Sequence, residues 1–338
     1  MGKPPLKMPA NLDNELHPGV LHIDCEAVSA AICGRLVEIV AKDLRRRGTV
    51  VALSGGVDSS VCAALAVEAL GPNKVFGLLL PEADSSSMSK DLGRRVAESL
   101  RIQYLEQDIT PTLTAIGCYQ WRDETIRSVF PGYKEAWKSK LAIAGGAEGR
   151  FNFFNLVVQS PDGAIQEQRL QYKEYLQIVA ATNYKQRIRK TIEYFHADRL
   201  HYAVVGTPNR LEYDQGFFVK NGDGAADIKP IAHLYKTQVY ALARYFELPP
   251  ETYNAKPTTD TYSLSQGQDE FYFTLPYPQM DLALWAYHHK LPAQLLAHAL
   301  NIEEARANFV YRDIEAKRRA TRYLHARPVL IEEVASFC

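Results

Sequence analysis

The sequence predicts an α/β protein: a doubly wound parallel sheet flanked by helices, with an inserted β-hairpin. Short apolar runs that fit buried strands alternate with longer segments whose apolar residues recur at helical spacing. A polar turn rich in glycine and serine joins the first of these strands to a helix, as is typical of such sheets. One segment near the middle of the chain has two alternating runs around a turn, which indicates antiparallel strands.

The composition of the chain is that of a soluble globular protein. Of its 338 residues, 46% are hydrophobic and 23% are charged. Lysine plus arginine and aspartate plus glutamate each number 39, and this zero net charge argues against nucleic acid or an anionic membrane as a partner. No run of about 18 apolar residues occurs, and the five cysteines form no CxxC pair. We therefore expect a cytoplasmic protein with neither a membrane span nor a disulfide framework.

The first part of the chain alternates helical and strand-like segments. Residues 1–18 are rich in proline and polar side chains, which predicts a flexible N-terminal arm, and residues 24–47 have the apolar spacing of an amphipathic helix followed by Gly48. The strands expected next are residues 49–53, 75–80 and 102–105, and the helices between them begin near Asp58 and at residue 91. This order predicts parallel strands joined by crossover helices.

The second part of the chain contains the inserted hairpin and further helices. The turn Pro161-Asp162-Gly163 lies between two alternating segments, so we expect a β-hairpin inserted at about residues 145–172. Residues 202–205 are expected to form another strand, and residues from about 281 to 338 a helical C-terminal segment. Apart from the arm, we expect a single domain over residues 19–338.

The first polar turn has the residue types that hold phosphate. Its sequence, SGGVDSS at residues 54–60, follows a buried strand and starts a helix. Glycines let the backbone approach an anion closely, and the first amides of the helix add the positive end of its dipole. The serine hydroxyls are further donors, whereas Asp58 is suited to a cation that bridges phosphate oxygens. The simpler interpretation is a glycine turn in which one Ser or Asp caps the helix. Two glycines and three serines are more than such a cap requires.

A second polar segment, residues 204–241, follows another expected strand. Gly206 and Thr207 come directly after that strand, at the edge of the sheet where α/β proteins bind ligands. Acidic and basic side chains follow at short spacing: Glu212, Lys220, Asp223, Asp227 and Lys236. A solvated loop with scattered salt bridges would also account for these charges.

Together the two segments resemble the ammonia-dependent NAD synthetase family, which belongs to the ATP-pyrophosphatase superfamily. SGGxDS resembles the pyrophosphate loop of that superfamily, and the family elements GT-x4-E, GFFTKYGDGGAD and LxK-x-Q match residues 206–212, 216–227 and 234–238. The likeness extends to LLLPEADSSS, NYKQRIRKTIEYF and KPTTD, and it covers roughly residues 20–285 apart from the hairpin. The resemblance implies a Rossmann-like sheet of the adenine nucleotide alpha hydrolase type.

The chain departs from the family pattern near the expected acceptor site. VKNGDGAAD stands where the family has TKYGDGGAD, so Val219, Asn221 and Ala225 replace a hydroxyl residue, an aromatic residue and a glycine. The segment after Thr258 is longer and more aromatic than usual, and we expect the hairpin to have no counterpart in the compact bacterial enzymes. These departures concern the acceptor side rather than the ATP side.

The resemblance assigns roles to individual residues. The ATP pyrophosphate would be held by Ser54, Gly55, Gly56, Asp58, Ser59 and Ser60. Mg²⁺ would be bound by Asp58 and Glu212, and ATP phosphates or the adenylate would be contacted by Thr207, Lys236 and Thr258. Deamido-NAD would be bound by Arg187, Phe217, Lys220, Asp223 and Asp227, although Phe217 is also explained as a core aromatic and Arg187 as a surface charge. The catalytic residues would be Asp58, Lys236, Thr258 and Asp223, with Asp223 as the base that deprotonates ammonium.

The implied reaction is the ATP-dependent amidation of deamido-NAD. ATP would adenylate its carboxylate with release of pyrophosphate, and ammonia would then displace AMP to give NAD. The resemblance also implies a homodimer, with helices at 24–47 and 110–195 as candidate interface, and free ammonia or a separate glutaminase as the nitrogen source. Two alternatives remain. One is a ligase that amidates a different carboxylate, and the other is a non-catalytic nucleotide-binding regulatory protein, which would not need the whole set of metal and leaving-group residues.

Overall fold

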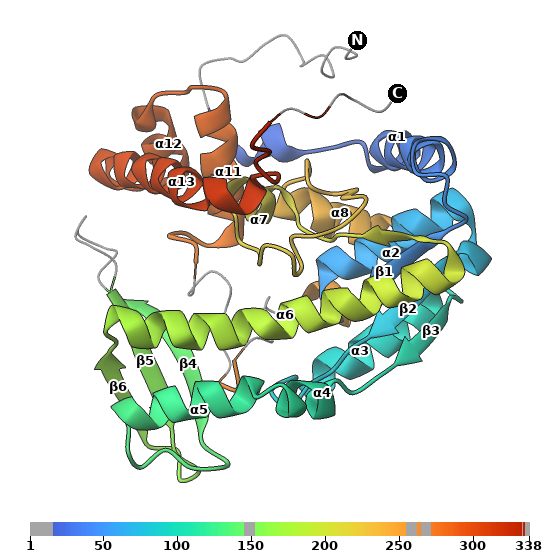
Figure 1. Ribbon diagram of the computed structural model, residues 1–338. Coiled ribbons are helices and arrows are strands. Elements are labelled where there is room, and N and C mark those ends of the chain that lie inside the picture. The colour runs from blue at the N-terminus through green and yellow to red at the C-terminus, as the bar shows by residue number, and fades with distance from the viewer. Residues whose placement is uncertain (1–15, 145–152, 255–261, 265–271, 333, 335–338) are drawn as a thin grey trace.

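The computed structural model describes residues 16–144, 153–254, 262–264, 272–332 and 334. This part of the chain contains two sheets, one with four strands and one with three. In Figure 1, one long helix, α6 (Tyr172–Leu200), runs from the smaller sheet to the larger one. No helix within the described residues is long and apolar enough to cross a membrane.

The larger sheet is parallel, with strand order β3-β2-β1-β7. Its strands are β1 (Thr49–Ala52), β2 (Val75–Leu79), β3 (Gln103–Glu106) and β7 (Ala203–Val205). Thr49 of β1 pairs with Val75 of β2 on one side and with Ala203 of β7 on the other. The chain thus builds the sheet outward from β1 in both directions, which confirms the predicted doubly wound parallel sheet.

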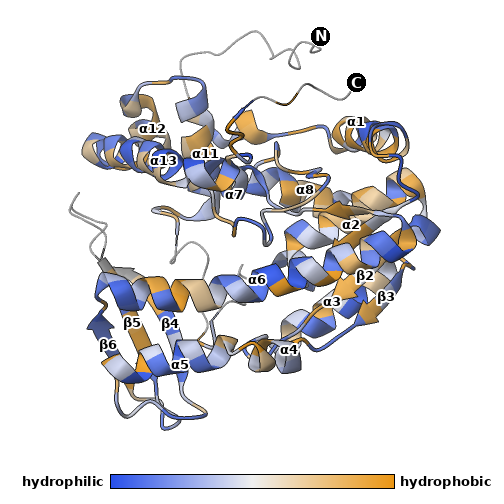
Figure 2. Cartoon of the chain, viewed as in Figure 1, coloured by the Kyte–Doolittle hydropathy of each residue, from blue (hydrophilic) through white to orange (hydrophobic). Residues whose placement is uncertain are grey.

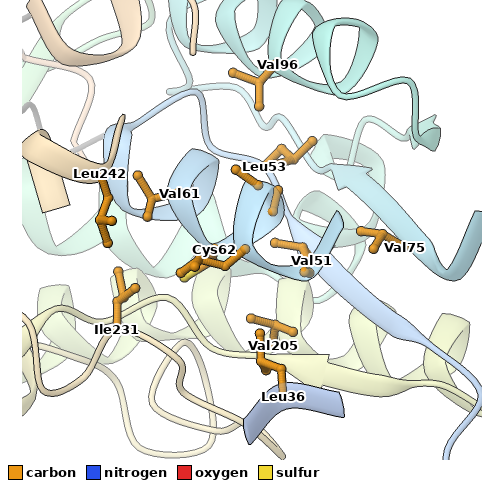
Figure 3. Packing of buried hydrophobic residues seen from close by; sticks show 14 of the residues in the cluster. Leu36, Val51, Leu53, Val61, Cys62, Val75, Val96, Val205, Ile231 and Leu242 are labelled. Carbon is orange, nitrogen blue, oxygen red and sulfur yellow. The ribbon is translucent and has the colours of Figure 1, made fainter. Parts of the chain in front are cut away.

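Helices cover both faces of the parallel sheet because its inner strands are apolar on both faces. These helices are α1 (Cys25–Glu38), α2 (Val57–Leu70), α3 (Ser87–Ser99), α4 (Thr110–Ala115), α5 (Cys118–Val129), α6 and α8 (Lys236–Tyr245). Val51 faces a core cluster shared with α1, α2, α3 and α8, whereas its neighbour Val50 faces α4, α5 and α6. Figure 3 shows the first cluster, in which Leu36 of α1 lies next to Val205 of β7 and Leu242 of α8 lies next to Val61 of α2.

The first helical segment ends earlier than the sequence predicts. α1 is followed by one wider turn, Ile39–Asp43, in which the amide of Leu44 donates to the carbonyl of Ile39 at 2.8 Å. Arg45 then takes the left-handed conformation, with a φ of 52°. This residue, rather than the predicted Gly48, therefore lies at the end of the helical segment.

The inserted segment is a three-stranded antiparallel sheet that contains the predicted hairpin. Its strands are β4 (Lys138–Ala144), β5 (Phe153–Gln159) and β6 (Ile165–Arg169), in that order. β5 and β6 form the hairpin, with Gly163 at a φ of 90° in its turn, but β4 adds a strand that begins ahead of the expected insertion. Ile126 of α5 and Ile178 of α6 pack with this sheet in a separate core cluster. We call the small sheet and the helix segments packed on it the small lobe.

Helices near the C-terminus enclose a further core cluster. They are α11 (Tyr277–His288), α12 (Ala293–Leu300) and α13 (Glu304–His325), and they pack with the short helix α7 (Arg210–Gln215), while α9 (Glu251–Asn254) lies against α2. Figure 2 shows hydrophilic and hydrophobic residues intermixed along α13, as expected for a helix with one exposed face. Leu16 and Leu21, the latter in the short 3-10 helix Pro18–Leu21, also pack into this cluster. Residues 1–15 of the predicted arm lie outside the described residues.

Candidate active site

A cavity of about 1010 Å³ lies at the carboxyl ends of β1 and β7. The strand order reverses between these strands, and this is the position at which α/β sheets bind ligands. The predicted site residues that line the cavity are Ser54, Gly55, Gly56, Asp58, Ser59, Arg187, Thr207, Glu212, Phe217, Lys220, Asp223 and Lys236. Ser60 and Asp227 are not among its lining residues, and Thr258 lies outside the described residues.

The glycine turn between β1 and α2 is open toward the cavity. Gly55 has a φ of 80°, and a Cβ on it would lie 2.3 Å from the carbonyl oxygen of Ser89 in α3. Backbone conformation and the close approach of α3 therefore both require glycine at this position. Gly56 immediately precedes α2, and no described side chain caps that helix. Because the first amides of a helix lack partners within it, the turn offers several donors to an anion.

The three serines of this turn have different surroundings. The Ser59 hydroxyl donates to the carbonyl of Gly56 at 3.0 Å and lies 3.1 Å from the Ser54 hydroxyl. The Ser60 hydroxyl donates to the same carbonyl at 2.9 Å, but Ser60 is fully buried. Ser54 and Ser59 thus line the cavity, whereas Ser60 braces the start of α2 from behind.

Asp58, Glu212 and Lys236 come together in the cavity. Lys236, at the start of α8, is 2% exposed, and its ammonium group forms a salt bridge with the Asp58 carboxylate. Asn209 links the two acidic residues: its side-chain amide donates to Asp58 Oδ1 at 3.2 Å, and its backbone amide donates to Glu212 Oε2 at 3.1 Å. The Asn209 side-chain oxygen in turn accepts from the Glu212 amide, which completes a capping box at the start of α7. Residues from three separate segments are therefore fixed around one point.

The charges of this cluster change one another's protonation. Burial raises the pKa of the Glu212 carboxyl above its usual value, and the nearby Asp58 carboxylate raises it further. Burial alone would lower the pKa of Lys236, but the two carboxylates outweigh burial and hold this pKa above its usual value. Lys236 therefore stays protonated in the cavity. The carboxylates of Asp58 and Glu212 favour the binding of a second cation beside them.

The donor set of Asp58 and Glu212 fits the predicted magnesium site. Proteins usually hold Mg²⁺ at nucleotide sites through one or two carboxylates together with substrate phosphates. Among the described residues, no group of three or more His, Cys, Asp or Glu side chains is suited to a metal, so this pair would need oxygens from ATP to complete the coordination. The glycine turn next to Asp58 is in position to present those phosphates.

Two of the residues expected to bind the acceptor line a further part of the cavity. The Phe217 ring lies 4.7 Å from the Tyr272 ring, and it packs at the edge of the C-terminal core cluster. Phe217 is therefore both a core aromatic and a cavity residue. The Arg187 guanidinium donates through Nε to the carbonyl of Lys220 at 3.2 Å, so α6 is tied to the loop after α7.

Other predicted acceptor residues have contacts that hold the fold. Lys220 Nζ donates to the carbonyls of Tyr323 and Ala326, at 2.9 and 3.0 Å, and so fastens the end of α13. The Asp223 carboxylate accepts from the amide of Val219 at 2.6 Å, which fixes its own loop. Both residues line the cavity as well, so their structural contacts and the predicted binding roles are compatible.

Asp227 lies apart from the other predicted acceptor residues. Its carboxylate accepts from the amide of Val204 in β7 at 2.7 Å and from the hydroxyl of Tyr194 in α6 at 3.3 Å. These contacts hold the loop against the edge of the parallel sheet. The structure thus gives Asp227 a role in fixing β7 rather than a place on the cavity wall.

Two residues of the site were not predicted from the sequence. Asn209 carries a local signal, because NRLE has the pattern of a capping box. Asp281 carries none: it belongs to α11, is fully buried, and accepts from the amides of Lys236 and Thr237 at 3.2 and 2.7 Å. Burial raises the pKa of Asp281 to about 6, although these amides act in the opposite direction. Asp281 caps α8 and thereby fixes the backbone that carries Lys236.

The sequence model of the NAD synthase family matches residues 28–132 and 151–323 of this chain. β4 falls in the unmatched stretch, whereas β5 and β6 lie inside the matched range, although we expected the whole hairpin to be an insertion. The match spans both polar segments that form the cavity. It therefore agrees with the resemblance seen in the motifs.

Curated relatives and solved structures support the same assignment. An NH(3)-dependent NAD(+) synthetase of Rhizobium meliloti is 56% identical over 294 residues, which are 87% of this chain and 88% of the relative. One of Mesorhizobium japonicum is 53% identical over 316 residues, with 93% and 99% covered. Among solved structures, an NH3-dependent NAD synthetase from Campylobacter jejuni matches with a TM-score of 0.60 and 21% identity, over 92% of this chain and all of that one. An NMN synthetase from Francisella tularensis matches with a TM-score of 0.58 and 19% identity, over 91% of this chain and 99% of that one. The solved structures establish the shared fold, and the family match together with the curated relatives shows that this chain is a member of the NAD synthase family.

Proposed function

We propose that this chain is an ATP-dependent amide ligase that joins ammonia to the carboxylate of deamido-NAD and forms NAD, AMP and pyrophosphate. Curated relatives that are 50 to 56% identical carry the name NH(3)-dependent NAD(+) synthetase and are matched over most of their length. In the structure, the observation that supports this activity best is the cluster of Asp58, Glu212 and Lys236 beside an open glycine turn.

The glycine turn and its neighbours would hold ATP by its phosphates. The two glycines let the backbone amides approach, Ser54 and Ser59 add hydroxyl donors, and Thr207 adds another from the end of β7. Asp58 and Glu212 would hold Mg²⁺, which when bound supplies positive charge to the phosphate oxygens. All of these groups line one cavity, so a single nucleotide can reach them together.

The remaining chemistry needs no nucleophile from the protein. The acceptor carboxylate attacks the α-phosphorus of ATP, the bond to the bridging oxygen breaks, and pyrophosphate leaves with that electron pair. The Lys236 ammonium and the amides of the glycine turn stabilise the charge that develops on the leaving pyrophosphate. Ammonia then attacks the carbonyl carbon of the acyl-adenylate, AMP leaves, and the amide remains. Catalysis therefore rests on positioning and electrostatics.

Asp223 is the residue that we assign as the base for ammonium. Its carboxylate lines the cavity and is held by the Val219 amide, so it has a defined position from which to accept a proton. For Thr258, the contact with the ATP phosphates or the adenylate stays a prediction that rests on the sequence alone. Arg187 and Phe217 line the cavity where the acceptor would extend away from the ATP phosphates.

For the assembly we propose a homodimer, as the family resemblance implies. Trp121 of α5 and Leu176 and Phe195 of α6 are apolar side chains that are 45%, 45% and 62% exposed, and they lie on helices within the range expected to contribute to the interface. A homodimer would cover them. Ammonia would come free from the cytoplasm or from a separate glutaminase.

The experiment that tests the proposed activity measures AMP formed from ATP, Mg²⁺ and ammonium with different carboxylic acids. We expect AMP and NAD in equal amounts when deamido-NAD is the acceptor, and no AMP without an acceptor. AMP formation with another acid but not with deamido-NAD would instead identify a ligase for a different carboxylate. ATP binding without AMP formation for any acid would identify a nucleotide-binding regulatory protein.

A further inference from the structure

One face of α6 forms a continuous wall of the cavity. Its lining residues recur every three or four positions and include Tyr175, Val179, Thr182, Gln186, Lys190 and Glu193. This spacing places them on the same side of the helix. From Tyr175 to Glu193 the helix rises by about 27 Å, at about 1.5 Å per residue. The cavity is therefore elongated along α6, and Figure 1 shows this helix joining the two sheets.

The chemistry of this wall changes along its length. Near the parallel sheet it is charged: Arg187 and Arg189 line the cavity as cations, and Lys190 and Glu193 form a buried pair whose side-chain atoms lie 2.6 Å apart. Near the small sheet it is apolar, because Tyr175 and Val179 pack at the edge of the small-lobe core. The charged end suits phosphate groups, whereas the apolar end suits a part of the ligand without charge.

The apolar end has the geometry of a platform for a flat ring. Phe154 of β5 and Tyr175 of α6 both line the cavity, and their rings stack with centroids 3.9 Å apart and planes 18° apart. Both side chains are only partly buried, so the pair keeps ring surface open to the cavity. The strand and the helix that carry them share one core cluster, so the platform is rigid.

The position of the reacting carboxylate sets the direction of the acceptor. That carboxylate must reach the ATP phosphates beside Asp58 and Lys236, at the end of the cavity next to the parallel sheet. The remainder of a dinucleotide then extends along α6, with its phosphates beside the charged stretch and its second base toward the small lobe. A mononucleotide, which lacks that base, would leave the far end of the cavity empty.

We propose that Phe154 and Tyr175 bind the adenine ring of the acceptor by stacking and thereby make this chain selective for a dinucleotide over a mononucleotide. This inference rests on the proposed function, because it names how that function's acceptor is recognised. Base stacking on an aromatic side chain changes binding by roughly 10-fold or more. The contact exists equally in the ground state and the transition state, so its loss should raise KM and leave kcat unchanged.

The test compares kcat/KM for deamido-NAD and for nicotinic acid mononucleotide at saturating ATP, Mg²⁺ and ammonium. We expect the wild type to prefer the dinucleotide. Phe154→Leu and Tyr175→Leu should each lower kcat/KM for the dinucleotide about 10-fold through KM, and leave the value for the mononucleotide within about twofold. Tyr175→Phe keeps the ring and should keep the preference. Tyr172→Leu is the matched control, because Tyr172 lies on the same helix, is 75% exposed and is not among the cavity-lining residues.

The other outcomes overturn the inference. Equal losses with both acceptors would show that the two rings only maintain the small lobe, and unchanged kinetics would show that they do not touch the acceptor. A wild type without preference would show that the far end of the cavity does not select. If the wild type forms no AMP with either nucleotide, the proposed function itself is rejected. This result is distinct from the outcomes above, in all of which the wild type forms AMP with at least one acceptor.

Discussion

The two halves of the cavity differ in what holds their residues in place. In the ATP half, which we define as residues 54–59 with Thr207, Glu212 and Lys236, the functional side chains contact one another at the ends of adjacent strands. In the acceptor half, residues 217–223 with the facing parts of α6 and α13, the residues that line the cavity also tie separate segments together. The functional side chains of the first half thus hold one another in place, whereas those of the second half hold other segments of the chain in place.

The largest effect is expected in the ATP half, at Lys236. Lys236→Met removes the cation that pairs with Asp58 and faces the leaving pyrophosphate, so we expect kcat to fall by about 100- to 1000-fold. AMP formation at saturating substrates measures this. Lys42→Met, at an exposed position of the wider turn after α1, is the control and should retain full activity. A Lys236→Met enzyme with more than about a tenth of the wild-type kcat would exclude a role in stabilising the leaving group.

The second prediction separates close packing from backbone strain in the glycine turn. Gly55 and Gly71 have nearly the same φ, 80° and 83°, but only at Gly55 would a Cβ collide with a neighbour, at 2.3 Å from the Ser89 carbonyl oxygen. Both Gly→Ala variants should lose about 1–3 kcal/mol of unfolding free energy, because both glycines have a positive φ that a residue with a Cβ adopts only under strain. Gly55→Ala should lose more and should also raise KM for ATP at least 10-fold, because the turn must shift away from α3.

Denaturant unfolding and ATP kinetics on both variants decide this point. Gly71→Ala serves as the matched control and should keep the wild-type KM for ATP. An equal KM for ATP in the two variants would mean that the turn does not contact the nucleotide, and residues 54–59 would then not belong to the ATP half.

The third prediction concerns Asp281, the buried residue of α11 that caps α8 and so fixes the backbone of Lys236 in the ATP half. The pKa of the Asp281 carboxyl is about 6 in the folded chain and close to 4 when the chain is unfolded, so the native state binds its proton more tightly. The contribution of this group to stability is complete below about pH 4 and is lost as the pH rises to about 6, by up to about 3 kcal/mol. Asp281→Asn cannot titrate there.

Chemical denaturation at a series of pH values tests this contribution. The difference in unfolding free energy between wild type and Asp281→Asn should change between about pH 4 and 6 and stay constant above that range. A constant difference from pH 4 upward would show that Asp281 is ionised throughout and that burial does not govern its pKa.

The smallest effect is expected in the acceptor half, at Lys220. Lys220→Met removes two hydrogen bonds from a charged group to the end of α13, so we expect a loss of about 1 kcal/mol in unfolding free energy. KM for the acceptor should rise only a few-fold, because α13 still packs through its core residues. A large rise in KM with unchanged stability would show instead that Lys220 binds the acceptor directly, and would make the two halves alike.

Much of the fold was predictable, because it depends on periodic patterns. The parallel strands were found from apolar runs that are buried on both sides, as at Val50 and Val51. β4 was missed as a strand of the small sheet, because Lys138, Ser139 and Lys140 at its start give no apolar signal and the strand is defined by its pairing with β5. The wider turn after α1 was not predicted either, because no sequence pattern distinguishes it from the helix before it.

The same distinction applies to the site. Asp58, Glu212 and Lys236 were predicted because each lies in a short motif next to a strand or helix end, and the structure brings them together. The contact of Asp227 with β7 and the cap that Asp281 provides for α8 were not predicted. Both depend on tertiary contacts whose partners lie far apart in the sequence, and no local spacing encodes them.

The pairing of β1 with β7 has a consequence for how the protein folds. Thr49 and Ala203 are neighbours in the sheet, yet α2 to α6 and the whole small lobe lie between them in the sequence. Closing so long a loop costs conformational entropy before its contacts form, so we expect β7 to join the sheet late, after β1 and β2 have paired. A nucleotide that contacts the ends of both β1 and β7 binds only the completed sheet, and it would therefore stabilise the last step of folding by mass action.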